Sequence, residues 1–189
     1  ASLDALYAEY AGVLAAGADY NVLSYLSSHD TRLFDRSRLR EAGSALMLAP
    51  GGVQIFYGDE SGRPAGAVPA SDPQQATRSD MNWQSLDAAL LAHWRKLGQF
   101  RSRHVALARG QHRRIQVEPY VFARVMANGS DRVVVMPAAE GEIEVPVADV
   151  FAEGAVVIDA YSGRPAVVAN GRAKLRAAGT VLLELADQD

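Results

Sequence analysis

Cysteine is absent from the 189-residue sequence, which excludes disulfide bonds and cysteine-ligated metal sites. An excess of one charge is also absent, because 22 acidic residues accompany 19 basic ones and the net charge is −3. This balance does not indicate a nucleic-acid or anionic-membrane surface. No apolar run reaches the roughly 20 residues that a transmembrane helix needs. Since the chain starts with Ala1 and shows no signal-peptide pattern, we expect a processed product or a truncated piece.

The apolar content, 49% of the residues, is typical of a globular protein, and the length suits one large domain or two small ones. Before residue 104, helical and strand-like patterns alternate. Apolar spacing predicts the helices, and the first of them has Ser2 as a cap and Gly17 as a stop. The predicted order is a helix over 2–17, a strand over 21–26, a helix over 37–49, a strand over 53–57, a loop over 61–84 and a helix over 86–102.

Beyond residue 104 the pattern changes to short alternating strands. Two Asn-Gly pairs, at 128–129 and 170–171, predict hairpin turns. Strands at this spacing indicate a small antiparallel sandwich. The predicted strands cover 113–117, 120–127, 131–137, 142–147, 155–160, 165–169, 172–177 and 180–185. We therefore divide the chain into two domains, 1–103 and 104–189.

Strand–helix alternation in the first domain favours a parallel sheet. Parallel sheets need cover on both faces, and two strand–helix units can neither cover themselves nor close a barrel. We therefore expect that the chain self-associates through this incomplete layer, or that it lacks an N-terminal portion.

Polar clusters follow both predicted strands, at the end where parallel α/β proteins carry their active sites. His29 and Asp30 follow the first strand, and Asp59 and Glu60 follow the second. Asp30 and Glu60 have the residue types of the carboxylate pair that cleaves glycosidic bonds. The alternative is structural, with Asp30 capping the next helix and Asp59 and Glu60 forming a solvated turn.

Three stretches resemble motifs of the α-amylase family of glycoside hydrolases. "VLSYLSSHDTRLF" (22–34) resembles the family's motif at the end of the seventh barrel strand, and "APGGVQIFYGDE" (49–60) resembles its eighth-strand motif. "RSDMNW" (78–83) is similar to the segment that often follows. The resemblance implies an α+β fold, in which the last two βα units of a (β/α)8 barrel, from the end of the sixth helix to the eighth helix, precede an antiparallel β-sandwich domain.

The resemblance also implies roles for four residues. Asp30 matches the family's third essential aspartate, which holds the 2- and 3-hydroxyls of the sugar at the cleavage site and stabilises the transition state. His29 matches the neighbouring histidine, which also holds sugar hydroxyls. Arg78 and Trp83 lie in the third stretch and are assigned to substrate binding. The segment 57–60 is then structural, so the carboxylate pair considered above does not apply.

The family's nucleophile and acid/base lie on the fourth and fifth barrel strands, and no residue of this sequence matches them. We therefore predict a parent enzyme that cleaves α-1,4-glucans such as starch or maltodextrin by retaining double displacement, and a chain that is inactive alone. No cofactor or metal is expected in the chain. Calcium is a candidate metal for the longer parent. The parent is expected to be periplasmic or secreted, and its partner to be an α-glucan oligosaccharide rather than a nucleic acid or a membrane.

Two other functions compete with this one. A small hydrolase would use Ser28 as nucleophile with His29. An independent carbohydrate-binding or structural β-sandwich module would instead depend on residues 104–189. Its sugar platform would be aromatic, yet packing in the sandwich core is favoured for the four candidates, Tyr120, Phe122, Phe151 and Tyr161.

The remaining polar and aromatic side chains are given structural roles. His93, His104 and His112 lack metal-ligand spacing, so we expect them at the surface or at helix ends. Trp94 has helical spacing and is expected in the core. The basic run 109–114 is expected to be a solvated linker.

Overall fold

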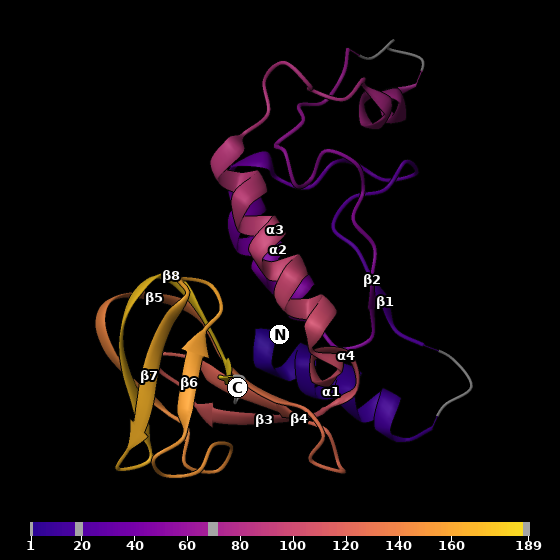
Figure 1. Ribbon diagram of the computed structural model, residues 1–189. Coiled ribbons are helices and arrows are strands. Elements are labelled where there is room, and N and C mark those ends of the chain that lie inside the picture. Colours follow the sequence, from indigo (N-terminus) through magenta and orange to yellow (C-terminus); the bar gives the residue numbers. More distant parts are fainter. Residues whose placement is uncertain (1, 18–20, 68–71, 187–189) are drawn as a thin grey trace.

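A computed structural model of the chain describes residues 2–17, 21–67 and 72–186. Figure 1 shows a helical part, in which α2 and α3 lie side by side, next to a curled antiparallel sheet. The helices are α1 (Leu3–Ala15), α2 (Leu39–Met47), α3 (Ala88–Arg103) and α4 (Val105–Arg109), with 3-10 turns η1 (Arg36–Arg38) and η2 (Pro73–Arg78). The strands are β1 (Leu23–Ser24), β2 (Gly52–Val53), β3 (Gln111–Gln116), β4 (Val121–Val125), β5 (Arg132–Pro146), β6 (Val156–Asp159), β7 (Arg164–Ala169) and β8 (Arg172–Leu185).

The predicted helices are confirmed, with small changes at their ends. Ser2 caps α1 by accepting a hydrogen bond from the N–H of Ala5, and Gly17 follows the helix with a left-handed φ of +67°. Asp87 caps α3 through the N–H of Leu90. In the described part of the chain, no helix combines the length and apolar character needed to cross a membrane.

The parallel sheet is present but shorter than predicted. β1 and β2 pair in parallel over two positions, and the N–H of Gln54 adds one bond to the carbonyl of Ser24 (2.9 Å). The predicted strand lengths, 21–26 and 53–57, are therefore wrong. Each strand has one neighbour within the described residues, and an unpaired edge gives the rest of the segment no ladder to join. The predicted loop 61–84 contains the turn η2, and its residues 68–71 lie outside the described ranges.

The second part of the chain is a six-stranded antiparallel sheet with the order β3-β4-β5-β8-β6-β7. β7 also pairs with the start of β8, whose end pairs with β6, so the β6–β7 hairpin folds back against β8. This curl fits the predicted sandwich. Both Asn-Gly turns are confirmed, because Gly129 (φ +70°) links β4 to β5, and Asn170 (φ +52°) and Gly171 (φ +70°) link β7 to β8.

Eight strands were too many, because four of the predicted ones form two long strands. The merged pairs are 131–137 with 142–147 in β5, and 172–177 with 180–185 in β8. Gly141 and Gly179 have φ of +77° and +115°, and they bend the strands without ending them. A register shift between Met136 and Ala139 adds a bulge in β5.

One apolar core joins the helices to one face of the sheet. Trp94 and Phe100 of α3 pack in it with Phe122 of β4, which confirms the expectation for Trp94. Gly43 of α2 lies against the indole of Trp94, where an added Cβ would approach the ring to 2.5 Å. Since this core crosses residue 104, it ties the two predicted domains together, and their division stays a prediction.

A second apolar core lies within the curled sheet. Phe151 belongs to it, whereas Phe122 and Tyr161 belong to the shared core. All three are buried, and Tyr120 is partly buried against the shared core. The four aromatic side chains therefore pack inside the protein, as favoured from the sequence.

Tyr161, in the turn between β6 and β7, connects the sheet to α2 and α3. Its hydroxyl lies 2.7 Å from Nδ1 of His93 and accepts a hydrogen bond from Nη2 of Arg40 (2.9 Å). Nε2 of His93 lies 3.0 Å from Oγ of Ser44, and Nζ of Lys96 donates to the carbonyl of Tyr161 (2.7 Å). His93 is buried, so its predicted surface or helix-end position is wrong, because both ring nitrogens find partners inside.

A second polar cluster fixes α1 on the sheet. Asp4 accepts hydrogen bonds from His112 (2.9 Å), Arg114 (2.8 Å) and the hydroxyl of Tyr120 (3.2 Å). Burial alone would raise the pKa of Asp4, but the hydrogen bonds from His112 and Tyr120 and the charge of Arg114 lower it below its ordinary value. The predicted surface position of His112 is wrong, since its side chain is 4% exposed. The segment 109–114 is not a linker, because it ends α4 and enters strand β3.

His104 lies at the end of α3, as predicted for a helix-end histidine. Its Nδ1 lies 2.8 Å from Oδ1 of Asp131, and its Nε2 lies 2.5 Å from Oε2 of Glu184. Asp131 also accepts the N–H of Ala106 in α4 (2.8 Å). The imidazole therefore joins the helices to the β4–β5 turn and to β8.

Acidification should weaken the fold through His93. Burial lowers the pKa of His93 from its ordinary 6.5 to about 4, and Arg40 contributes to the shift. In the unfolded chain His93 is protonated as pH falls below about 6.5, whereas in the folded chain it stays neutral down to about pH 4. The free energy of unfolding therefore falls as pH decreases across this window. Between pH 7 and pH 4.5, we expect the free energy of unfolding to fall by about 2 kcal/mol more in the unaltered chain than in His93→Gln. Urea unfolding at both pH values measures this, and equal losses would contradict it.

Candidate functional site

A buried carboxylate ties the ends of β1 and β2 together. Asp59 is inaccessible to solvent, and its Oδ1 accepts hydrogen bonds from Oγ of Ser27 and Nη2 of Arg36, both at 2.8 Å. Glu60 closes the same turn by accepting the N–H of Gly58 (2.9 Å). The alternative of a solvated Asp59–Glu60 turn is therefore wrong, because Asp59 bridges two segments in the interior.

Three of the predicted site residues come together above this bridge. Nε2 of His29 lies 3.1 Å from Oδ2 of Asp30, and Nη2 of Arg78 lies 3.8 Å from Oδ1 of Asp30. The Asp30 side chain is 71% exposed and that of His29 is 62% exposed. A carboxylate held between two such donors, yet open to solvent, is suited to accepting hydrogen bonds from the hydroxyls of a ligand.

Trp83 ends the segment that carries Arg78. It is 74% exposed, which makes it the most exposed large hydrophobic side chain among the described residues. An indole in this position offers an apolar face to a ligand, and it has no part in the core.

A buried arginine supports the segment around Arg78. Arg63 has no solvent exposure, and its guanidinium donates to three backbone carbonyls, those of Tyr57, Thr77 and Ser79, each at 3.0 Å. Nη1 also contacts Oγ of Ser79. The guanidinium carbon lies 3.9 Å from the ring centroid of Tyr57, which is a cation–π contact.

Thr77 connects the same segment to the end of β1. Its Oγ1 donates a hydrogen bond to the carbonyl of His29 (3.1 Å). From the other side, the hydroxyl of Tyr57 donates to the carbonyl of Ser79 (2.9 Å). The ends of β1 and β2 and the 77–83 segment therefore form one connected structure, which we call the rim.

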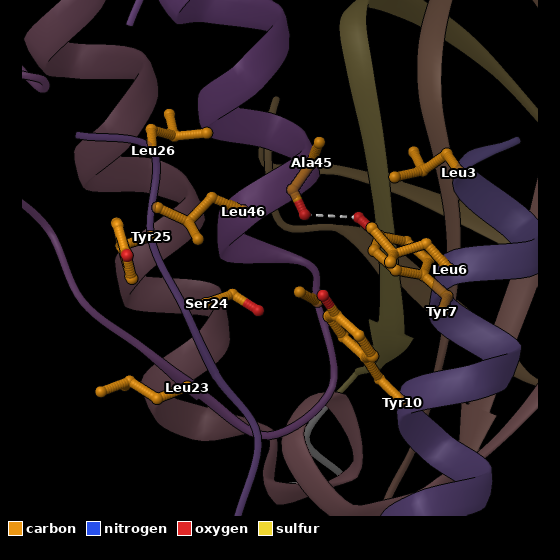
Figure 2. Close-up of a pocket in the computed structure, with 11 residues that line it drawn as sticks. Leu3, Leu6, Tyr7, Tyr10, Leu23, Ser24, Tyr25, Leu26, Ala45 and Leu46 are labelled. Atoms are coloured by element: carbon orange, nitrogen blue, oxygen red, sulfur yellow. Dashed lines mark hydrogen bonds between the residues drawn. The ribbon is translucent and has the colours of Figure 1, made fainter. Parts of the chain in front are cut away.

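Two hollows lie near these elements. The first, of about 700 Å³, borders the rim and is lined by Gly66, Ala67, Asp72, Gln75, Arg78, Ser79 and Asp80. The second, of about 290 Å³, is apolar and lies between α1 and the β1–α2 layer, where Tyr7 donates to the carbonyl of Ala45 (2.6 Å), as Figure 2 shows. Its lining includes none of the four predicted site residues.

Other interpretations of the β1 end find no support. Oγ of Ser28 lies 3.1 Å from Oγ1 of Thr31 and accepts the N–H of Asp30 (3.3 Å), whereas Nε2 of His29 faces Asp30. A nucleophilic serine instead needs a histidine within hydrogen-bond reach as its base. The first turn after the strand is capped by Asp35, so Asp30 is not the cap.

Sequence reasoning does not predict the supporting role of four residues that hold the rim by hydrogen bonds. They are Arg63, Thr77, Ser27 and Arg36. A loop arginine between Gly and Pro is normally exposed, and no periodicity marks its burial. Gly58 is the available signal, since it has φ of +88° and an added Cβ would lie 2.4 Å from Cβ of Arg63. A glycine directly after a strand can therefore indicate a turn that packs on a buried side chain.

Removal of the Asp59 carboxylate should destabilise the protein strongly. In Asp59→Ala, Arg36 loses its 2.8 Å counter-charge in a largely buried site, and we expect a loss of about 2–4 kcal/mol. In the control Glu41→Ala, the broken ion pair with Arg38 is exposed, and we expect less than about 1 kcal/mol. Urea unfolding compares the two variants, and similar losses would show that Asp59 is not the anchor.

The sequence comparisons give one relative of assigned function. No family model matches the chain. Over 125 residues, 64% of this chain, the sequence is 53% identical to the periplasmic α-amylase of Escherichia coli (strain K12). The match spans 18% of that protein, so the chain covers about a fifth of its relative's length.

Solved α-amylases share the fold. The α-amylase of Anoxybacillus superposes with a TM-score of 0.67 at 19% identity, covering 98% of this chain and 46% of that one. The α-amylase of Geobacillus thermoleovorans, solved with acarbose, gives a TM-score of 0.67 at 18% identity, covering 93% and 42%. At such identities the likeness shows the fold alone. The chain is therefore similar in sequence to the C-terminal region of the periplasmic α-amylase, and it shares the fold of solved α-amylases.

Proposed function

We propose that the chain forms the end of the catalytic barrel and the C-terminal domain of an α-amylase-type glycoside hydrolase. In this proposal α1 ends the sixth barrel unit, β1 and β2 are the seventh and eighth barrel strands, and α2 and α3 follow them. The parallel pairing of β1 and β2, with α2 between them, supports the assignment, because parallel neighbours joined by a helix are the unit of such barrels. Residues 104–189 are the β-sandwich domain.

Asp30 is the catalytic residue that this chain contributes. One observation carries the proposal: its exposed carboxylate lies at the end of β1, between His29 and Arg78. There it accepts hydrogen bonds from the 2- and 3-hydroxyls of the sugar at the cleavage site. Such bonds strengthen as positive charge develops on the sugar ring, so they stabilise the transition state more than the substrate.

The neighbours of Asp30 bind substrate. His29 donates to a sugar hydroxyl while its ring stays beside the carboxylate, and Arg78 supplies the opposite charge. Trp83 offers its indole face to a sugar ring at the edge of the rim. The substrate class is an α-1,4-glucan such as starch or maltodextrin, and the acarbose complex of the Geobacillus enzyme supports an oligosaccharide ligand.

The reactive groups of the retaining double displacement come from elsewhere in a longer parent. Glu60 does not replace them in this proposal, because its carboxylate is used to close the turn at Gly58. Without a nucleophile and an acid/base the chain alone binds sugar but does not cleave it. The parent is proposed to be periplasmic or secreted, like the protein that the Escherichia coli match names.

Calcium stays a proposal for the longer parent only. Within the described ranges of this chain, no three His, Asp or Glu side chains gather in an arrangement that could hold a metal ion.

The alternative of an independent carbohydrate-binding or structural module in residues 104–189 has less support. Phe122, Phe151 and Tyr161 are buried, so they offer no stacking face for a sugar. The hydroxyl of Tyr120 binds Asp4 of α1. The aromatic side chains of this part therefore serve packing and docking.

Asp30→Asn should weaken sugar binding without changing the fold. We expect maltotriose, titrated into the unaltered chain and followed by NMR, to bind about tenfold more weakly after the substitution, because hydrogen bonds to a charged acceptor are the stronger ones. Asp149→Asn, which removes an exposed carboxylate in the turn between β5 and β6, is the matched control and should bind as the unaltered chain does. Neither protein should hydrolyse a chromogenic maltooligosaccharide.

Two outcomes would contradict this part of the proposal. Equal maltotriose affinity in Asp30→Asn and the unaltered chain would remove Asp30 from the site. Hydrolysis by the unaltered chain that disappears in Asp30→Asn would show that the reactive groups are present after all, with Glu60 as the leading acid.

The chain is also proposed to form homo-oligomers through the exposed face of β1 and β2. Leu23, Tyr25 and Ile55 are exposed there, and exposed apolar groups of this kind favour association. Light scattering should report a mass above that of the monomer, and the double variant Leu23→Ser, Ile55→Ser should lower it. Val167→Ser, at an exposed position of β7, is the control. A clean monomer across a wide concentration range would exclude this association.

A further inference from the structure

Full burial of Arg63 calls for an explanation. Arg63 forms no ion pair among the described residues, and Asp59, the nearest fully buried carboxylate along the chain, pairs with Arg36 instead. All of its backbone partners are carbonyls, at Tyr57, Thr77 and Ser79. A buried guanidinium needs such compensation, but apolar packing would fill the same space without a charge. The reason for burying an arginine here must therefore be sought in which residues carry these three carbonyls.

Two of the three carbonyls flank Arg78. Nη2 of Arg63 holds the residue before it, Thr77, and Nη1 holds the residue after it, Ser79, each at 3.0 Å. Oγ of Ser79 also donates to the carbonyl of Pro64, next to Arg63 in the chain (2.9 Å). Fixing the backbone on both sides of Arg78 sets the direction in which its side chain leaves the chain, and here that side chain approaches Asp30.

The hydrogen bonds of Arg63 also connect to His29, through Thr77. Thr77, whose carbonyl Arg63 holds, donates from its Oγ1 to the carbonyl of His29 (3.1 Å). The path from Arg63 through Thr77 to His29 therefore joins the end of β2 to the end of β1 on the side where Asp30 lies. Arg63 itself is buried and touches neither His29 nor Asp30 in any hydrogen bond or ion pair of the described residues.

Gly58 shows how closely the guanidinium is fitted. An added Cβ at Gly58 would lie 2.4 Å from Cβ and 2.5 Å from Nε of Arg63, and the φ of +88° already favours glycine. The rings of Tyr57 and Phe56 lie 3.9 Å and 5.6 Å from the guanidinium carbon. The planar fork of arginine suits this geometry, whereas the single ammonium of lysine cannot reach three carbonyls in three directions.

We propose that Arg63 is a positioning residue of the sugar-binding site, which holds Arg78 and His29 around Asp30 without contacting the sugar. This inference rests on the proposed function of the rim and adds a residue to it. Supporting residues of this kind matter because a ligand site loses affinity when its own side chains are not held in place.

The chain provides a matched control in Arg101. Its guanidinium is partly buried and, like that of Arg63, donates to three carbonyls, those of Met47 (2.9 Å), Ala49 (2.7 Å) and Gly51 (2.5 Å). These carbonyls run from the last residue of α2 to the residue before β2, at the opposite end of β2 from the rim. Loss of Arg101 should therefore cost stability in the same way as loss of Arg63, but should leave the rim in place.

The test compares Arg63→Met, Arg63→Lys and Arg101→Met in the full chain, with maltotriose affinity from NMR titration and stability from urea unfolding. We expect both Met variants to be less stable, but only Arg63→Met to lose affinity, by about tenfold. Arg63→Lys should also bind more weakly than the unaltered chain, because charge alone does not restore the three bonds.

Thr77→Val is a milder variant, for the case that Arg63→Met does not fold. It removes the hydroxyl that binds the carbonyl of His29 and keeps the shape of the side chain. We expect an affinity loss of several-fold with little change in stability. When Thr77→Val is combined with Arg63→Lys, the further loss of maltotriose affinity should be smaller than the loss that Thr77→Val causes alone, because both act through the same path.

The outcomes separate this inference from the function on which it rests. If the unaltered chain does not bind maltotriose, the proposed function fails and the inference falls with it. If the unaltered chain binds and Arg63→Lys and Thr77→Val bind equally well, the inference alone is wrong. An equal affinity loss in Arg101→Met would also overturn it, since Arg63 would then act through stability only.

Discussion

The buried Asp59 carboxylate is the interaction on which the rim depends. β1 and β2 share only two ladder positions, so backbone pairing alone does not fix how the strands end. Asp59 does this by accepting from Ser27 after β1 and from Arg36 before α2. Its Oδ2 has no hydrogen-bond partner among the described residues, so the charge relies on these two donors. Removal of either side would leave a buried charge, which is why so small a sheet can keep a defined edge.

The helices and the sheet are held together by a different principle. A shared apolar core supplies most of the contact, and polar groups at its border fix the register. Tyr161 bonds to α2 and α3, Asp4 holds α1 on β3, and His104 joins α3 to β8. The helical part and the antiparallel sheet therefore share one core, although their sequences follow different patterns.

The sequence predicts the larger features well, because they depend on local patterns. Helix caps such as Ser2 and Asn-Gly turns such as 170–171 are set by a few neighbouring residues. The meeting of Asp30 with Arg78, 48 positions away, is not local, and it was expected only from the resemblance of both segments to family motifs. Strand lengths are less predictable, because β5 and β8 continue through glycines that resemble stops. Burial of His93 and Arg63 cannot be predicted, since their partners come from distant segments.

Arg63 and Arg101 show why residue type alone does not determine a role. Both are guanidinium groups that gather three backbone carbonyls, and both lie beside β2. At one end of the strand the carbonyls belong to a helix–strand connection, so the arginine closes the fold. At the other end two of the three carbonyls flank Arg78, so the same chemistry sets the direction of a side chain that faces Asp30. What a buried cation does is decided by the segments whose carbonyls it holds, and in this chain one segment closes the fold whereas the other carries Arg78.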